Sequence, residues 1–326
     1  MDVSIIIVNY HSMELVKDCI NSIFEKTKEL TYEIIVVDND SRDGSVEKLK
    51  EYFENKIFVI DAKENLGFGK ANNIGARVAR GKFLFFLNPD TILINNAMKY
   101  LLNYLNRDPK VGIVGGNLYG PEMNAAPSFS RYFDDIVSEK KNASWSAIVC
   151  GKIKEKLRNK KYMKRSYEEN FNYSGIPMEV AYIFGADMMM KRSLFNEVGG
   201  FDPDFFMYAE EEELSWRIHQ IGKSIVSVPD AKIIHLEGMT VKKIDTFSEK
   251  QFRMRMNGGM LYYKKRFGMS GVNKFYKLRL RRYRRLILIA KLRGKNIDNF
   301  EPSIQRRLLE QEYHRFLKEN GVRYYG

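Results

Sequence analysis

Cysteine, proline and long hydrophobic runs are all scarce in this sequence of 326 residues. The 2 cysteines, Cys19 and Cys150, are too few for a disulfide framework or a four-ligand zinc site, so we expect a reducing, cytoplasmic compartment. No run reaches the roughly 18 apolar residues that a membrane-spanning helix needs. Asp2 and the polar residues after Val8 argue against a signal peptide. These absences favour a folded protein without a membrane span.

Acidic residues are missing from one long segment near the C-terminus. Between Lys250 and Ile297 there are 16 Lys and Arg and no Asp or Glu. Residues 241–326 carry 23 basic and 7 acidic residues, whereas residues 1–240 carry 31 and 34. Apolar residues at helical spacing among the arginines predict an amphipathic basic helix over Gly271–Leu292. Such a helix favours an anionic membrane surface, with a nucleic acid, an acidic protein or a packed helix with a solvated basic face as alternatives.

Short apolar runs alternate with helical patterns through the first hundred residues. The runs have strand length, and their nearly continuous apolarity indicates burial on both faces; they are 3–8, 33–37, 57–60 and 83–87, with a further one at 111–114. Helical patterns lie between them at Met13–Glu25, Ser45–Phe53 and Gly69–Arg80. This alternation predicts an α/β protein with a mostly parallel sheet in a three-layer αβα sandwich.

Polar residues follow three of the predicted strands, at the sheet edge where such folds bind ligands. They are Asn9-Tyr10, Asp38-Asn39-Asp40-Ser41 and Asn88-Pro89-Asp90. The first strand end has neither G-x-G-x-x-G nor a Walker lysine, which argues against a dinucleotide or P-loop site. The glycines of Asn65-Leu66-Gly67-Phe68-Gly69 fit either a phosphate contact at a helix start or a tight turn.

Several blocks in order resemble one family, the inverting family 2 glycosyltransferases of the GT-A fold, particularly the rhamnosyltransferase-like branch of bacterial polysaccharide synthesis. The blocks are Val3–Tyr10, Val37–Ser41 with Asp43–Ser45, Asn65–Gly75, Phe86–Asp90, Gly185-Ala186, Val198–Asp202 and Phe205–Tyr208. The resemblance implies a GT-A catalytic domain over 1–240, with a nucleotide-sugar-binding half at 1–115 and an acceptor half at 116–240. Residues 241–326 would then form a basic, mostly helical C-terminal extension.

The resemblance also implies a donor site. Asp38 matches the family position that contacts the nucleotide base, with Val8, Tyr10 and Asn39 beside it, and the donor set continues in Asn65 and Gly67. Asn88-Pro89-Asp90 takes the place of the metal-binding Asp-x-Asp motif, so Asp90, joined by His235, would hold Mn²⁺ or Mg²⁺. The alternatives are that Asp38 caps a turn with Ser41, that Asn88–Thr91 is an ordinary turn, and that His235 is structural.

Four consecutive acids, Glu210 to Glu213, contain the candidate catalytic base. The family pattern places Glu211 on its catalytic Asp, although Glu is longer by one methylene, about 1.5 Å. Either the acceptor lies further away or Glu210 is the base. Glu213 and Arg217 are spaced i,i+4, which predicts an ion pair on a helix face.

These residues imply an inverting transfer of L-rhamnose from dTDP-rhamnose, or of a hexose from a UDP-sugar, to a saccharide or lipid-linked acceptor. We expect the enzyme at the inner face of the plasma membrane, in peripheral contact with anionic lipid through residues 250–297. A nucleic-acid-binding protein is the alternative, but the net acidic body lacks a recognition motif and we expect no nucleic acid partner. A homodimer is left open, residues 134–173 fit a helical insertion or a flexible excursion, and Asp187 has no assigned role.

Overall fold

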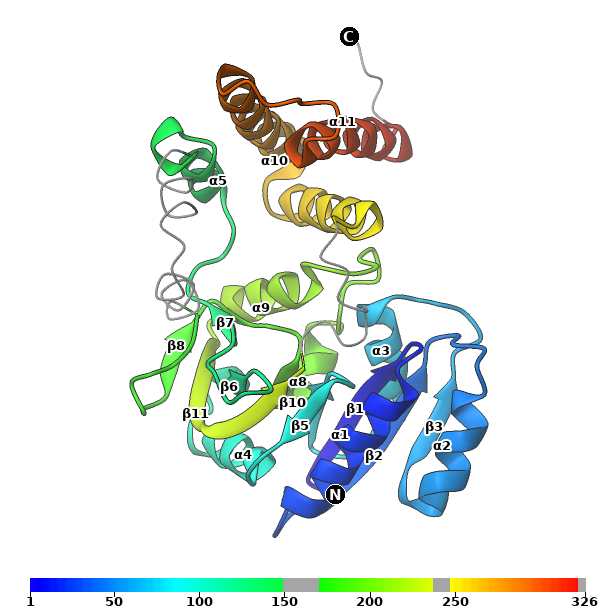
Figure 1. The fold of residues 1–326 in the computed structure, drawn as a ribbon. Coiled ribbons are helices and arrows are strands. Elements are labelled where there is room, and N and C mark those ends of the chain that lie inside the picture. The colour runs from blue at the N-terminus through cyan, green and yellow to red at the C-terminus, as the bar shows by residue number, and fades with distance from the viewer. Residues whose placement is uncertain (149–169, 237–246, 322–326) are drawn as a thin grey trace. The chain divides into compact units, whose positions relative to one another are not determined.

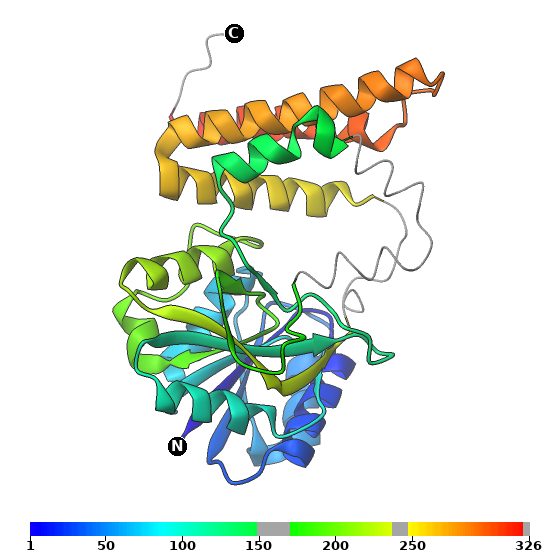
Figure 2. The same cartoon turned by 90° about the vertical axis from the view of Figure 1, so that its left-hand side faces the viewer.

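The structure is a computed structural model that describes residues 1–148, 170–236 and 247–321 (Figures 1 and 2). The described residues fall into two compact units. The first, here called the sheet unit, lies within Met1–Phe133, Lys164–Phe206 and Glu210–Lys243. The second, the helical unit, lies within Asp134–Met163, Met207–Ala209 and Ile244–Gly326. The predicted domain boundary between residues 240 and 241 falls outside the described residues.

The described part of the sheet unit forms one nine-stranded sheet in the order β3-β2-β1-β4-β10-β6-β11-β5, with β8 on β11. Its strands are β1 Val3–Asn9, β2 Tyr32–Asp38, β3 Phe58–Asp61, β4 Phe83–Leu87, β5 Thr91–Leu93, β6 Val111–Tyr119, β8 Met178–Val180, β10 Asp187–Lys191 and β11 Ser224–His235. The pairs among β1 to β4 and the pair β6–β11 are parallel, whereas β10, β5 and β8 run antiparallel to their neighbours. A second, two-stranded sheet pairs β7 Phe129–Ser130 with β9 Tyr182–Ile183.

Helices cover both faces of the large sheet, as Figure 1 shows. On one face, α1 Met13–Lys26, α2 Ser45–Phe53 and α4 Ala97–Arg107 bury aliphatic side chains such as Ile20 and Leu101 against Ile5 and Ile7. On the other, α3 Phe68–Val78, α8 Arg192–Glu197 and α9 Glu210–Gln220 contribute to a second core cluster that contains Ile6. Successive residues of β1 therefore enter opposite cores, which explains the unbroken apolar run. The predicted α/β sandwich, strands and helices are confirmed.

The helical unit contains α5 Ile136–Asn142, α10 Glu249–Leu292 and α11 Glu301–Glu319 (Figure 2). The helix predicted over Gly271–Leu292 is present, but α10 begins 22 residues earlier, at Glu249. It is broken at Gly268, whose φ of 64° lies in the left-handed region that favours glycine. Asp135 caps α5 by accepting the backbone N–H of Ser138. Within the described residues, no helix combines the length and apolarity needed to cross a bilayer.

Candidate active site

The carboxyl ends of β1 and β2 are joined by a buried hydrogen-bond network around Asp38. Its Oδ2 accepts the Asn9 amide at 2.6 Å and the Ser41 hydroxyl at 2.7 Å, and its Oδ1 accepts the Ser41 backbone N–H at 2.9 Å. The carboxylate is 2% exposed. The capping contact with Ser41 that the sequence offered as the alternative is therefore present. Contact of Asp38 with a nucleotide base stays a prediction.

Asn9 is a partner of Asp38 that the sequence placed at a strand end without assigning it a role. Its side chain is fully buried, donates to Asp38 and accepts the Ser12 backbone N–H at 3.2 Å. The sequence signal for this role was a polar residue at the end of a continuous apolar strand. On either side of Asn9, Val8 is half-buried and Tyr10 is 40% exposed, so Tyr10 is accessible to solvent at this strand end.

The Asn39 side chain, which follows β2, is hydrogen-bonded to the turn that contains Asn65 and Gly67 at the start of α3. The Asn39 amide donates to Asn65 Oδ1 at 3.1 Å and to the Gly67 carbonyl at 3.3 Å, and its oxygen accepts the Leu66 N–H at 2.9 Å. Gly67 has φ 78°, and a Cβ there would overlap the carbonyl oxygen of Phe206. The tight-turn explanation of this glycine is thus present in the structure, and a phosphate contact stays a prediction.

Asp90 and His235 meet where β5 pairs with β11. His235 is the register partner of Thr91, and the Leu236 N–H donates to the Asp90 carbonyl at 2.8 Å. These backbone contacts place Asp90 Oδ1 3.3 Å from His235 Nε2. Asp90 is only 4% exposed. Two residues 145 positions apart in the sequence are therefore neighbours at a strand end, as the metal prediction requires.

The turn from Asn88 to Thr91 connects β4 to β5. The Thr91 hydroxyl donates to the Asn88 carbonyl at 2.7 Å, and the Asn88 N–H donates to the Ala186 carbonyl at 2.9 Å. No group of three or more His, Cys, Asp or Glu that could hold a metal occurs in the described part of the chain. The pair of Asp90 and His235 offers one carboxylate and one imidazole, so phosphate oxygens and water would supply the remaining ligands of a divalent cation.

Helix α9 begins with Glu210 and Glu211, directly after two residues with left-handed backbone, Tyr208 (φ 72°) and Ala209 (φ 71°). Burial raises the pKa of the Glu211 carboxyl, and burial together with the neighbouring Glu211 raises the pKa of Glu210 well above its usual value. Glu210 is 3% exposed, and its Oε2 has no hydrogen-bond partner among the described residues. Both acids therefore favour the protonated form more than an ordinary surface glutamate does.

The predicted ion pair between Glu213 and Arg217 is confirmed. Arg217 Nε lies 2.7 Å from one carboxylate oxygen, and Nη2 lies 2.7 Å from the other. The guanidinium also donates to the backbone carbonyls of Val198 and Gly200. This pair fixes α9 to the loop that precedes it, whereas Glu210 and Glu211 form no ion pair with any residue that the structure describes.

Asp187 is a buried acid to which the sequence assigned no role. It begins β10, next to Ala186, whose carbonyl accepts the Asn88 N–H. It is fully buried, its Oδ2 accepts the Gly116 N–H at 2.5 Å, and its Oδ1 is unbonded among the described residues. Burial raises the pKa of Asp187 well above its usual value. Asp187 therefore follows directly after a residue that is hydrogen-bonded to Asn88, and it has no access to solvent.

The sheet order, the helices on both faces and the strand-end residues define the GT-A glycosyltransferase fold. Two solved structures are similar over nearly the whole chain, each with a TM-score of 0.58. One is GalNAc-T7 with UDP, GalNAc and Mn²⁺ (16% identity, 98% of this chain, 56% of that chain), and the other is the mannosyltransferase PcManGT from Pyrobaculum calidifontis with GDP-Man and Mn²⁺ (15%, 97%, 87%). At these identities the likeness establishes the fold.

The chain belongs to glycosyl transferase family 2, whose model matches residues 4–208. Curated relatives include the poly-beta-1,6-N-acetyl-D-glucosamine synthase of Staphylococcus aureus, 25% identical over 70% of this chain and 48% of the relative. Another is the N-acetylglucosaminyl-diphospho-decaprenol L-rhamnosyltransferase of Mycobacterium tuberculosis, 25% identical over 62% of this chain and 66% of the relative. The chain thus spans about half the length of the first relative. The predicted family membership is confirmed.

Proposed function

We propose that this protein is an inverting, metal-dependent glycosyltransferase that moves a sugar from a nucleoside diphosphate to a saccharide or lipid-linked acceptor. The observation that carries the proposal is the 3.3 Å approach of Asp90 and His235 at a strand end of a family 2 chain. A carboxylate and an imidazole from distant parts of the sequence are brought together there, at the edge where open α/β sheets bind their ligands.

Asp90 and His235 would hold the divalent cation, Mn²⁺ or Mg²⁺. The bound cation would offset the negative charge that develops on the departing diphosphate. Around it, the donor-binding residues are Val8, Tyr10, Asp38, Asn39, Asn65, Gly67 and Asn88. Tyr10 offers an exposed ring to the base, and Asp38 holds the strand ends of β1 and β2 in place through Asn9 and Ser41.

Glu211 is the proposed general base. It accepts the proton of the acceptor hydroxyl while that oxygen forms a bond to the anomeric carbon and the bond to the diphosphate breaks from the opposite side. One displacement inverts the configuration, and the products are the glycoside, the nucleoside diphosphate and a protonated Glu211. The half-buried position of Glu211 supports this assignment over Glu210, which is almost completely buried.

The donor and acceptor proposals rest on the relatives. One relative is named as an L-rhamnosyltransferase acting on a diphospho-decaprenol, and another as a synthase of an N-acetylglucosamine polymer. These names support dTDP-rhamnose or a UDP-hexose as donor and a role in bacterial cell-surface polysaccharide synthesis. We also propose peripheral contact with the inner face of the plasma membrane through residues 250–297, whose charge is entirely basic.

A thermal-shift screen with UDP, dTDP, GDP and CMP, with and without Mn²⁺ or Mg²⁺, tests the nucleotide site. A ligand that binds only the native protein raises its melting temperature. We expect a metal-dependent rise with dTDP or UDP, which the Asp90→Ala variant loses and the Glu122→Ala variant, altered at an exposed carboxylate, retains. Absence of a shift with every nucleotide and metal would contradict the proposal.

A further inference from the structure

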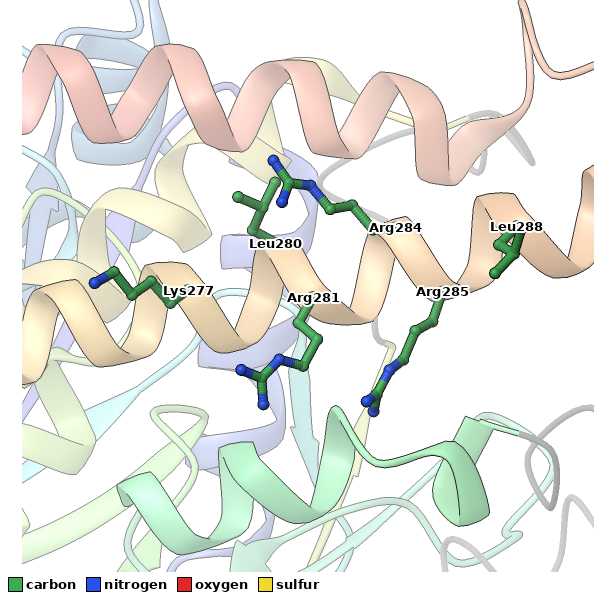
Figure 3. A pocket seen from close by; sticks show the side chains of 6 residues that line it. All are labelled: Lys277, Leu280, Arg281, Arg284, Arg285 and Leu288. Carbon is green, nitrogen blue, oxygen red and sulfur yellow. The ribbon is translucent and has the colours of Figure 1, made fainter. Parts of the chain in front are cut away.

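One face of α10 carries exposed cations at helical spacing. Lys277, Arg281, Arg284 and Leu288 are all exposed and follow one another at steps of four, three and four residues. Together with Leu280 and Arg285 they line a hollow of about 340 Å³ (Figure 3). These six side chains are called the basic groove below. All of them come from one helix of the helical unit, so the groove belongs to that unit alone.

Other cations of the basic segment are already engaged within the helical unit. Arg279 donates to the buried carboxylate of Glu139, with Nε at 2.9 Å, and Arg253 donates to Glu312 at 2.6 Å. Arg285 donates to the Ala143 carbonyl and lies 4.9 Å from the centre of the Trp145 ring. The charges of Arg279 and Arg253 therefore hold helices together, and Arg285 lines the groove while its guanidinium is already engaged, so the groove's available cations are the other three.

Lys277, Arg281 and Arg284 differ from these residues. No hydrogen bond or ion pair to them is formed by any described residue, and the sequence has no acid between Lys250 and Ile297. Seven positions along a helix span about 10 Å, so the three like charges repel one another unless an anion lies among them. The groove is therefore complementary to an anionic group.

Apolar side chains continue the same face. Leu288 is 45% exposed and Leu292, one helical turn further, is 78% exposed. Exposed leucines in line with arginines are the pattern of a helix lying in the interface of a membrane, where the cations meet phosphates and the leucines enter the acyl boundary. The groove exposes no aromatic side chain on which a nucleic acid base could stack.

We propose that the basic groove binds the phosphate groups of anionic phospholipids, with Leu288 and Leu292 entering the lipid layer. This inference rests on the membrane contact proposed above and narrows it from residues 250–297 to one face of α10. The occupant is a lipid surface, because an isolated phosphate ion would satisfy the arginines and leave both leucines in water.

Sedimentation with sucrose-loaded vesicles tests this assignment on the full chain. The variant Lys277→Gln/Arg281→Gln/Arg284→Gln is compared with Arg306→Gln/Arg307→Gln/Lys318→Gln, which removes the same charge from exposed positions of α11. On vesicles containing phosphatidylglycerol, we expect the groove variant to lose about a hundredfold in partition coefficient and the α11 variant much less. Leu288→Gln should weaken binding without changing its salt dependence.

Equal losses of partition coefficient in the two triple variants would overturn the proposal, because the overall charge of the helical unit would then explain vesicle binding without the groove. So would equal binding to pure phosphatidylcholine vesicles, or full displacement by millimolar inorganic phosphate or by RNA. The nucleotide-dependent thermal shift separates the two proposals. A groove variant that loses vesicles but keeps its shift with dTDP or UDP affects this inference alone, whereas vesicle binding by a protein without any nucleotide shift contradicts only the glycosyltransferase proposal.

Discussion

Two buried carboxylates of the sheet unit lack the cation partner that two buried carboxylates of the helical unit have, although Glu213 of the sheet unit is paired with Arg217. In the helical unit, Glu139 and Glu312 are nearly inaccessible, and each meets an arginine, Arg279 and Arg253 respectively. In the sheet unit, Glu210 and Asp187 are as deeply buried, yet no cation pairs with either among the described residues.

A buried charge without a partner costs free energy that a purely structural acid would not retain. An acid that joins helices is therefore paired, whereas a buried acid without a cation has no positive charge to offset the rise in its pKa and is suited to exchanging a proton. Three tests, on Glu211, Arg279 and Asp187, sharpen or break this contrast.

The largest expected effect is on catalysis. Glu211→Gln removes the proton acceptor while keeping the shape of the side chain, and we expect transfer to fall by about 10²- to 10⁴-fold. Initial rates with saturating donor and acceptor measure it. Because the base must be deprotonated and burial raises its pKa, the rate of the native enzyme should increase with pH through that raised pKa.

Glu210→Gln is the matched comparison, one position away on the same helical turn. We expect it to transfer sugar with a much smaller loss than Glu211→Gln, and both variants to keep the metal-dependent thermal shift with the nucleotide. If Glu211→Gln keeps its activity and Glu210→Gln loses it, the base is Glu210.

The second largest expected effect is on the stability of the helical unit. Arg279→Met leaves the carboxylate of Glu139 buried without its partner, and breaking such a pair typically costs about 3–5 kcal/mol. Urea unfolding followed by circular dichroism measures the loss. Arg281→Gln, an exposed cation two positions away, should change stability little.

The double variant Glu139→Leu/Arg279→Met checks the reason for that loss. It removes both charges, so a large part of the lost stability should return. A double variant as unstable as Arg279→Met alone would show that packing of the arginine stem, and not the uncompensated charge, was responsible.

The sequence predicted the parts of the fold that depend on local pattern. Unbroken apolar runs identified β1, β2 and β4, and i,i+4 spacing identified the pair of Glu213 and Arg217, because both signals lie within a few neighbouring residues. The roles of the site residues did not follow from spacing alone. They came from the family resemblance, which also assigned Asp90 and His235 to one metal site.

Contacts between segments that are far apart in the sequence could not be predicted from it. The partner of Arg279 is Glu139, 140 positions earlier, in a Lys-rich segment whose own pattern is weak. Of the 16 basic residues between Lys250 and Ile297, the sequence could not separate those that hold helices from those that face outward. That distinction depends on which side of α10 the other helices cover.

The smallest expected effect concerns Asp187, where the pH dependence of stability tests the contrast most directly. The pKa of Asp187 is raised in the folded protein above its unfolded value near 3.8. Its contribution to the free energy of unfolding is therefore complete at pH values below that unfolded pKa, and it is lost as pH rises through the folded pKa. Asp187→Asn keeps an oxygen that can accept the Gly116 N–H but cannot ionise. We therefore expect the variant to gain stability relative to the native protein as pH rises, within the roughly 0.5–3 kcal/mol usual for single substitutions. Urea unfolding at a series of pH values measures the difference. A difference that is constant with pH would mean that Asp187 is compensated in its ionised form, and the contrast between the two units would then rest on Glu210 alone.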